Sequence, residues 1–292
     1  MKKCTTLLIS DYGADADAWH KAFSVHDPEA DVRTWDGQWK PAEVDAILID
    51  TTMTSRGGFA QFKNLRWVSY LGHGAGDVLS DPTLPAGVIV TRLQDQQLAE
   101  SVKLSALQSV LSHQQRIVDY RGQQASREWS RIRTKQPSDF SVVVLGMGFI
   151  GAQIANMLKD HGFSVSTWSR SKKSIPGIAS CTTGAELDEL LGRADFVLSI
   201  LPETPSTRHL FDASKFRLFG PDCAFANLGR GSAVKEDDLV QAIATGQLHC
   251  AFLDVFETEP LPSLSPLWSN QRVIITPHAG GALEQVVTAL SR

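Results

Sequence analysis

The sequence predicts an α/β protein with two doubly wound, parallel-sheet domains, and three observations lead to this fold class. Short apolar stretches rich in β-branched residues alternate with stretches of helical periodicity along the 292 residues. The length suits two domains, and a hydrophobic content of 42% is enough for ordinary packed cores. A glycine-rich turn over Gly146–Gly151 lies between a predicted strand and a predicted helix.

Residues 1 to about 95 alternate short strands with helical or turn segments. A helix is predicted over Ala14–Phe23, and Val44–Asp50 is a clear buried strand because it reads Val-Asp-Ala-Ile-Leu-Ile-Asp. The other predicted strands are Thr5–Ser10, Asp31–Trp35, Arg66–Leu71 and Val88–Thr91. This alternation predicts a small parallel α/β domain.

Three glycines follow the Arg66–Leu71 strand, in the stretch Leu-Gly-His-Gly-Ala-Gly-Asp at positions 71–77. Backbone N–H groups exposed in such a loop suit an anion such as a carboxylate. A flexible surface turn is the other interpretation. Gly72, His73 and Gly74 are therefore candidate substrate-binding residues.

A long helix is predicted from Asp95 to about Trp129, because apolar residues recur there at helical spacing. Such a helix suits a bridge between two domains with an oligomerisation surface, and an ordinary amphipathic helix explains the pattern equally well. The polar and basic stretch Ser130–Phe140 is predicted to be a loop that leads into the second domain.

The second domain repeats strand and helix units. Helices are predicted over Phe149–Lys159, Ala185–Leu191 and Glu236–Thr245. The predicted strands are Val142–Leu145, Phe163–Trp168, Phe196–Leu201, Cys223–Leu228, Cys250–Asp254 and Val273–Thr276. In a doubly wound sheet of this kind, the ligand is expected beyond the carboxyl ends of the strands.

The turn between the first strand and helix of this domain has the G-x-G-x-x-G spacing of a dinucleotide site. Gly146 suits the tight turn, Gly148 allows a pyrophosphate to approach the backbone, and Gly151 allows the helix to pack closely on the sheet. The N–H groups at the start of the helix would face the pyrophosphate. The turn predicts a Rossmann domain, with Met147, Phe149 and Ile150 also near the dinucleotide.

The residues after the second strand of this domain favour NADP over NAD. An NAD enzyme usually places Asp or Glu there for the ribose 2′-hydroxyl, whereas this chain reads Trp-Ser-Arg-Ser-Lys-Lys at 168–173. Ser169 can donate a hydrogen bond, Arg170 can bind a 2′-phosphate bidentately, and Lys172 or Lys173 can add charge. Ser169, Arg170, Ser171 and Lys172 are therefore candidate cofactor-binding residues. A solvated basic loop is the plainer interpretation.

Three later strand ends carry groups suited to hydride transfer to a keto acid. This reaction needs a cation for the carboxylate, an acid that protonates the developing alkoxide, and a group that keeps this acid charged. Arg230, His278 and Glu259 meet these needs. Taken singly, each has a structural explanation: Arg230 as a surface charge, His278 as a hydrogen-bonded histidine and Glu259 as a turn residue.

Together with the glycine turn, these stretches resemble the D-isomer-specific 2-hydroxyacid dehydrogenase family over nearly the whole chain. The resemblance is greatest to the shorter glyoxylate/hydroxypyruvate reductases, through the stretches at 71–74, 90–95 and 168–171. It implies a flavodoxin-like substrate domain formed by residues 1–97 and 279–292, and a Rossmann NAD(P)-binding domain formed by residues 98–278. It also implies NADPH-dependent reduction of glyoxylate or hydroxypyruvate to a D-2-hydroxy acid.

The resemblance assigns a role to each candidate residue. Arg230 binds the substrate carboxylate and polarises the ketone, His278 is the proton donor, and Glu259 is its partner. Asp254 contacts the nicotinamide carboxamide. The remaining cofactor contacts are Leu201, Pro202 and Thr207 in a loop near the adenosine and pyrophosphate, with Leu228 and Gly229 beside Arg230. The family also implies a homodimer formed through Ser101–Arg131.

Several alternatives stay open. Phosphoglycerate dehydrogenase is disfavoured by the missing regulatory domain, and formate dehydrogenase by Glu259, where that branch is expected to carry Gln. A dinucleotide-sensing binding protein similar to corepressors is the alternative from another class. The loop Gly-His-Gly-Ala-Gly-Asp departs from the usual Gly-Ala-Gly-Val-Asp, which leaves the substrate open. A short helix is expected over Gly280–Leu290, where relatives usually continue longer.

Net charge, apolar runs and cysteine spacing limit the partners and the cellular compartment that the sequence suggests. The net charge of −4 and the absence of a basic tract predict no nucleic-acid partner. No apolar run reaches the length of a membrane span, so no membrane partner is expected. The four scattered cysteines lack C-x-x-C spacing, which favours buried thiols in a reducing compartment over disulfides or a metal site. A cytoplasmic location follows as the expectation.

Overall fold

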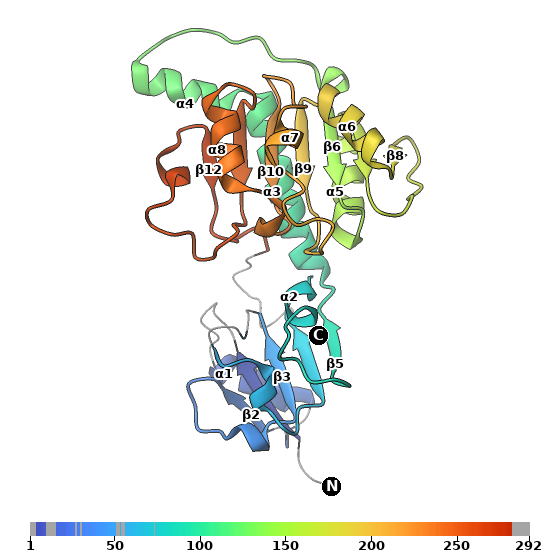
Figure 1. Ribbon diagram of the computed structural model, residues 1–292, viewed down its shortest axis with the longest axis vertical. Helices are drawn as coiled ribbons and strands as arrows, with labels where there is room; N and C mark the ends of the chain where they lie inside the picture. The colour runs from blue at the N-terminus through green and yellow to red at the C-terminus, as the bar shows by residue number, and fades with distance from the viewer. Residues whose placement is uncertain are drawn as a thin grey trace. The chain divides into compact units, whose positions relative to one another are not determined.

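The computed structural model describes residues 4–9, 16–26, 28–29, 31–50, 53, 56–72 and 74–281 (Figure 1). The chain divides into two compact units, the first ending at Gln97 and the second beginning at Leu98. The predicted return of residues 279–292 to the first domain falls mostly outside the described residues, as does the helix expected over 280–290. Both stay predictions.

The first unit is built on a parallel sheet. Its strands in the described residues are β1 (Thr5–Ile9), β2 (Asp31–Thr34), β3 (Ala46–Ile49), β4 (Trp67–Tyr70) and β5 (Ile89–Arg92), in the order β2-β1-β3-β4-β5. Helix α1 (Ala16–His26) packs Trp19 against one face, and α2 (Gly76–Leu79) packs Val78 against the other. This strand order is that of a flavodoxin-like fold.

The second unit contains a longer sheet whose described strands are also all parallel. They are β6 (Ser141–Leu145), β7 (Ser164–Trp168), β8 (Ala179–Cys181), β9 (Phe196–Ser199), β10 (Ala224–Asn227), β11 (Cys250–Leu253) and β12 (Val273–Ile275). The order β12-β11-β10-β9-β6-β7-β8 reverses direction between β6 and β9. This is the Rossmann order, and its ligand crevice lies at the point of reversal. The edge strand β8 was not predicted, because Ala-Ser-Cys is too short and polar to show a pattern.

Helices cover both faces of this sheet (Figure 1). On one face lie α3 (Gln96–Gln114), α4 (Ile117–Ser126) and α5 (Phe149–Asp160). On the other lie α6 (Gly184–Arg193), α7 (Ala213–Phe216) and α8 (Glu236–Ala244). The β-strand residues alternate between the two cores, so that Val143 and Leu145 face one and Val142 and Val144 the other. The predicted α/β fold class is confirmed.

The prediction of one helix from Asp95 to Trp129 is wrong. Helix α3 ends at Gln114, and α4 begins at Ile117 after Arg116 takes a left-handed conformation with φ 57°. Arg116 lies 3.7 Å from Asp119, three residues further on, and 3.6 Å from the distant Asp222, so one local and one tertiary ion pair form at the break. Arginine is a good helix former, and helical periodicity therefore cannot indicate the break.

All four cysteines lie in the described residues and carry free thiols. Cys223 and Cys250 are buried and Cys181 is partly buried. Cys4 is exposed, so the expectation of a buried thiol is wrong there, because Cys4 precedes the first residue of β1.

Among the described helices, none combines the length and the apolar composition that crossing a bilayer requires.

Candidate active site

The predicted site residues of the second unit follow the ends of its parallel strands. Gly146 follows β6, Ser169 follows β7, and Leu228 follows β10. Asp254 follows β11 and Thr276 follows β12. Because the carboxyl ends of parallel strands meet at one edge of a sheet, the structure brings these loops together there.

The glycine turn fits a dinucleotide. Gly146 has φ 101°, and a Cβ at this position would lie 2.7 Å from the Ile200 carbonyl oxygen. A Cβ at Gly151 would lie 1.8 Å from the Gly146 oxygen, so only glycine lets α5 pack this closely. A Cβ at Gly148 would instead meet none of the described atoms within 4 Å. The open side of the turn is therefore where a pyrophosphate can approach the backbone.

The first turn of α5 offers a positive end to that pyrophosphate. The N-cap residue of this helix is Gly148, which has no side chain to occupy the start of the helix. The N–H groups of a helix N-terminus and the helix dipole favour an anion. Phe149 is exposed and Ile150 partly buried, whereas Met147 is 6% exposed and packs in the core. Any contact of Met147 with a dinucleotide therefore comes from its backbone.

The loop after β7 presents cations on a fixed backbone. The buried Ser169 hydroxyl donates to the Ser171 carbonyl at 2.8 Å, and the Ser169 N–H donates to Cys181 at 3.1 Å. Arg170, Ser171 and Lys172 are exposed. Ser169 therefore shapes the loop, and the two cations extend from it into solvent.

The loop after β9 is held by its own threonine. The Thr207 hydroxyl donates to the Pro202 carbonyl at 2.7 Å and accepts from the Thr204 N–H at 2.9 Å. A Cβ at Gly229 would lie 2.6 Å from the Leu201 carbonyl oxygen, so this loop packs directly on the one after β10. The structure gives Thr207 a structural role, and its contact with a cofactor stays a prediction.

The Arg230 loop is positioned by a residue to which sequence reasoning gave no role. The fully buried Asn227 side chain donates to the Arg230 carbonyl at 2.9 Å and accepts from the Gly229 N–H at 3.2 Å. The Arg230 guanidinium donates to the Gly229 carbonyl at 2.8 Å. A polar residue at the end of a buried strand was the available signal, since such a residue needs hydrogen-bond partners.

Glu259 and His278 form a direct pair. His278 Nδ1 lies 2.8 Å from Glu259 Oε2, and the other carboxylate oxygen accepts from the Phe256 N–H at 2.9 Å. Burial raises the pKa of Glu259, but the hydrogen bond and charge of His278, the Phe256 N–H and the charge of Arg230 together hold this pKa below its ordinary value. Glu259 is therefore ionised at neutral pH, and its contact with Nδ1 leaves Nε2 of His278 for substrate.

Asp254 holds the turn that carries His278. Its buried carboxylate accepts from the Thr276 hydroxyl at 2.5 Å, the Ala279 N–H at 2.8 Å and the Gly280 N–H at 2.9 Å. Its backbone carbonyl accepts from the His278 N–H at 2.7 Å. His278 has φ 51°, a left-handed conformation that costs roughly 1–2 kcal/mol in a non-glycine residue and that these bonds maintain. The predicted contact of Asp254 with a nicotinamide stays a prediction.

The predicted substrate loop belongs to the first unit. Gly72 comes two residues after the end of β4, and a Cβ there would lie 2.8 Å from the Tyr70 ring. Gly74 is partly buried, and His73 lies outside the described residues. The role of this loop in substrate binding stays a prediction.

We expect His278→Asn to raise the pKa of Glu259. Asn tolerates the left-handed backbone, but it is uncharged and too short to reach the carboxylate, so the hydrogen bond and charge that lower this pKa are lost. In the wild type, the lowered pKa stabilises the fold above the ordinary pKa of Glu, and this contribution is lost as pH falls through the folded pKa. A carbon-13 NMR titration of the carboxyl groups measures the change.

Glu186 is the internal control for this titration. Its pKa is lowered by the N–H groups of Thr182 and Thr183 at the start of α6, which the substitution leaves in place. A Glu259 pKa that stays low while Glu186 is unchanged would show that His278 is not the cause.

Comparisons with known proteins agree with this arrangement. The sequence model described as D-isomer specific 2-hydroxyacid dehydrogenase, NAD binding domain, matches residues 107–280. Glyoxylate/hydroxypyruvate reductase A of Serratia proteamaculans (strain 568) is 35% identical over 272 residues, covering 90% of this chain and 85% of the relative. The Yersinia enterocolitica protein of the same name is 32% identical over 285 residues, covering 94% and 90%.

Solved structures show the same likeness. An NADPH-dependent glyoxylate/hydroxypyruvate reductase from Sinorhizobium meliloti, in complex with NADP and sulfate, has a TM-score of 0.87 at 29% identity, covering 99% of this chain and 92% of the other. A D-isomer specific 2-hydroxyacid dehydrogenase from Xanthobacter autotrophicus Py2, in complex with NADPH and MES, has a TM-score of 0.86 at 32% identity, covering 98% and 91%. The chain therefore belongs to the D-isomer-specific 2-hydroxyacid dehydrogenase family and is an NAD(P)-dependent oxidoreductase.

Proposed function

We propose that this chain reduces a small 2-oxo acid, of glyoxylate or hydroxypyruvate size, to the D-2-hydroxy acid with NADPH. The observation that carries the proposal is the pair of His278 Nδ1 and Glu259 Oε2 at 2.8 Å, with the charge of Arg230 acting on the same carboxylate. The relatives from Serratia and Sinorhizobium, which are named as glyoxylate/hydroxypyruvate reductases, support the choice of substrate.

In this proposal, His278 is the proton donor. When bound, the reduced nicotinamide supplies a hydride for C2 of the oxo acid. Nε2 of His278 gives its proton to the carbonyl oxygen, and the Glu259 carboxylate stabilises the positive charge of the imidazolium through Nδ1. The left-handed backbone and the Asp254 bonds keep the ring in one orientation.

Arg230 binds the substrate carboxylate and polarises the ketone. Its loop is anchored by Asn227, and a Cβ at the neighbouring Gly231 would lie 1.9 Å from the Phe256 carbonyl carbon. This contact packs the Arg230 loop against the loop that leads to Glu259. A guanidinium held this way offers a planar pair of donors that matches a carboxylate.

The preference for NADPH rests on the loop after β7. Arg170 and Lys172 are exposed there, and residues 169–173 contain no carboxylate for a ribose 2′-hydroxyl. The complexes of the relatives from Xanthobacter and Sinorhizobium with NADPH and NADP support this choice.

The main test is NADPH oxidation with glyoxylate and with hydroxypyruvate. We expect turnover in the wild type and a loss of about 10²–10⁴-fold in kcat for His278→Asn, because a positioned general acid contributes that much. NADPH binding, measured by fluorescence, should persist in this variant. Arg230→Lys should raise KM, since lysine cannot bind a carboxylate bidentately.

Arg217→Lys is the matched control, because Arg217 is exposed just after α7 and lies outside the predicted site. No turnover of either oxo acid by the wild type, despite NADPH binding, would contradict the proposal and favour a dinucleotide-sensing protein.

A second test concerns cofactor choice. We expect Arg170→Asp to weaken NADPH binding by at least tenfold, since it replaces a phosphate-binding cation with a repelling anion, and to improve the use of NADH. The ratio of kcat/KM for the two cofactors measures the change. An unchanged ratio would show that Arg170 does not contact the 2′-phosphate.

We also propose a homodimer through the region 101–131. An apolar hollow of about 360 Å³ is lined there by residues of α3 and α4 that include Leu104, Leu107, Leu111 and Ile117. Leu104 is 56% exposed and Ile117 45% exposed, which is unfavourable for apolar side chains unless they are covered. A second copy of the chain would cover this hollow.

We expect the double substitution Leu104→Asp with Leu111→Asp to convert a dimer into a monomer, because two buried and unpaired charges oppose association. Light scattering after size exclusion measures the mass. Leu264→Asp is the control, because Leu264 is 95% exposed outside this region. A monomeric wild type would refute the proposal.

A further inference from the structure

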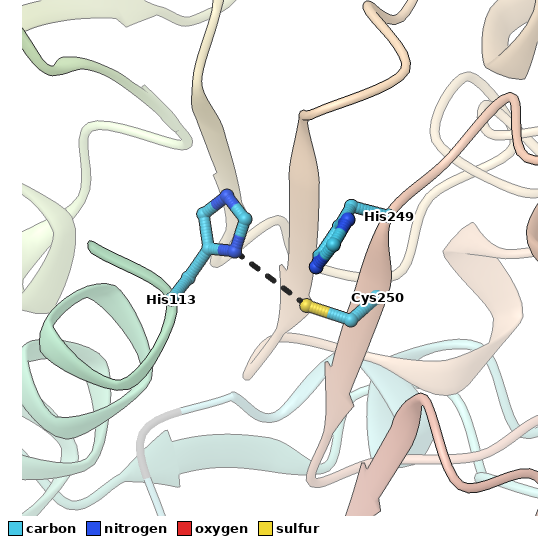
Figure 2. A group of neighbouring side chains, drawn as sticks. All are labelled: His113, His249 and Cys250. Atoms are coloured by element: carbon cyan, nitrogen blue, oxygen red, sulfur yellow. Dashed lines mark hydrogen bonds between the residues drawn. The ribbon is translucent and has the colours of Figure 1, made fainter. Parts of the chain in front are cut away.

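A cluster of metal-binding side chains lies away from the candidate active site and has no part in the proposed reaction. His113 is in the last turn of α3, His249 directly precedes β11, and Cys250 is its first residue. One ligand atom from each lies within 4.8 Å of the others. Figure 2 shows the two imidazoles and the thiol pointing toward one another. Asp254, at the other end of β11, is about 13 Å away at the usual rise of a strand.

His113 is oriented as a metal ligand. Its Nε2 lies 2.9 Å from the Asp222 carbonyl oxygen, which can only accept a hydrogen bond, so the proton is on Nε2. With its proton on Nε2, His113 directs the lone pair of Nδ1 toward Cys250 Sγ, 3.7 Å away. A metal-bound histidine usually donates its other N–H to such a carbonyl.

The separation of Cys250 from His113 matches tetrahedral zinc. Cys250 Sγ lies 3.7 Å from His113 Nδ1. Zn–S and Zn–N bonds of ordinary length at a tetrahedral angle place the two ligand atoms about 3.6 Å apart. Little movement is therefore needed for both atoms to bind one ion.

His249 supplies the third ligand and connects the cluster to an acid. Its side chain is 11% exposed, and Nε2 lies 3.0 Å from an oxygen of Asp119, on α4. One thiolate and one carboxylate together balance the charge of a divalent ion. Arg116 is 3.7 Å from Asp119, and Arg272 is 3.4 Å from His249 Nδ1. These two positive charges lower the affinity of the cluster for a cation.

We propose that His113, His249 and Cys250 form a structural zinc site, with the Asp119 carboxylate providing the remaining negative charge. Sulfur and imidazole ligands in tetrahedral geometry select zinc among the common divalent ions. Binding would displace the Cys250 thiol proton and form a Zn–S bond. The ion would join the end of α3 to the first residue of β11, in addition to the apolar contacts of that core.

The test uses the full-length protein after treatment with a chelator. Zn²⁺ is titrated in competition with a chromophoric chelator, and Co²⁺ is used separately to detect the absorption of a thiolate–metal bond. We expect one ion per chain, with a thiolate band. Binding should weaken at least tenfold in Cys250→Ser and in His249→Gln. It should also weaken in Asp119→Asn, which removes a negative charge beside His249 Nε2.

Cys181→Ser is the matched control, because Cys181 lies on β8 at the opposite edge of the sheet. It should bind zinc as the wild type does, and zinc should raise the melting temperature of the wild type and of this control only. Wild-type protein that binds no stoichiometric zinc overturns the proposal even if a variant fails to fold. Tight binding that persists in both Cys250→Ser and His249→Gln overturns it as well.

Discussion

The carboxylate of Asp254 organises the edge of the larger sheet that carries the candidate active site. Three donors from Thr276, Ala279 and Gly280 converge on it, and its backbone carbonyl binds the His278 N–H. A buried carboxylate is unfavourable unless its oxygens are hydrogen-bonded, so the turn that supplies these donors is strongly favoured over alternatives. The turn holds His278 in a left-handed conformation, and in this conformation its ring contacts Glu259. The position of His278, the candidate general acid, therefore depends on the carboxylate of Asp254, although its ring pairs with Glu259.

Close backbone packing brings the other loops to the same edge. Gly229 allows contact with the Leu201 backbone, and Gly231 allows contact with Phe256. Phe256 in turn donates its N–H to Glu259. The positions of Arg230 and of the Glu259–His278 pair are thus linked through backbone contacts that any side chain at the two glycines would disrupt. Such rigidity favours catalysis, because charged groups held in place need little reorganisation during reaction.

The sequence alone predicts the parts of this architecture that depend on local pattern. Buried parallel strands appear as apolar runs, and the spacing of Gly146, Gly148 and Gly151 predicts the tight turn between β6 and α5 that the structure shows. The break at Arg116 is not predictable, because one of the two ion pairs that form there is with the distant Asp222. The partners of Asn227 and Thr207 are not predictable either, because they depend on which backbone groups the fold leaves nearby. The polar Asn227 at the end of a buried strand indicates only that it needs hydrogen-bond partners. The resemblance predicts that Asp254 contacts the nicotinamide, which stays a prediction, whereas its three bonds to the turn require the structure.

The two ends of β11 have different chemistry for a physical reason. Its four strand residues are buried and pair with β10 and β12, so polar groups can be placed only at the ends of the strand. At the carboxyl end, Asp254 accepts hydrogen bonds from a turn. At the amino end, His249 contacts Asp119, and Cys250 contacts the imidazole of His113 on α3. A thiol is a weak donor and gains little from that contact. The proposed zinc site would use the thiol and the two imidazoles that the fold brings together at this end of the strand.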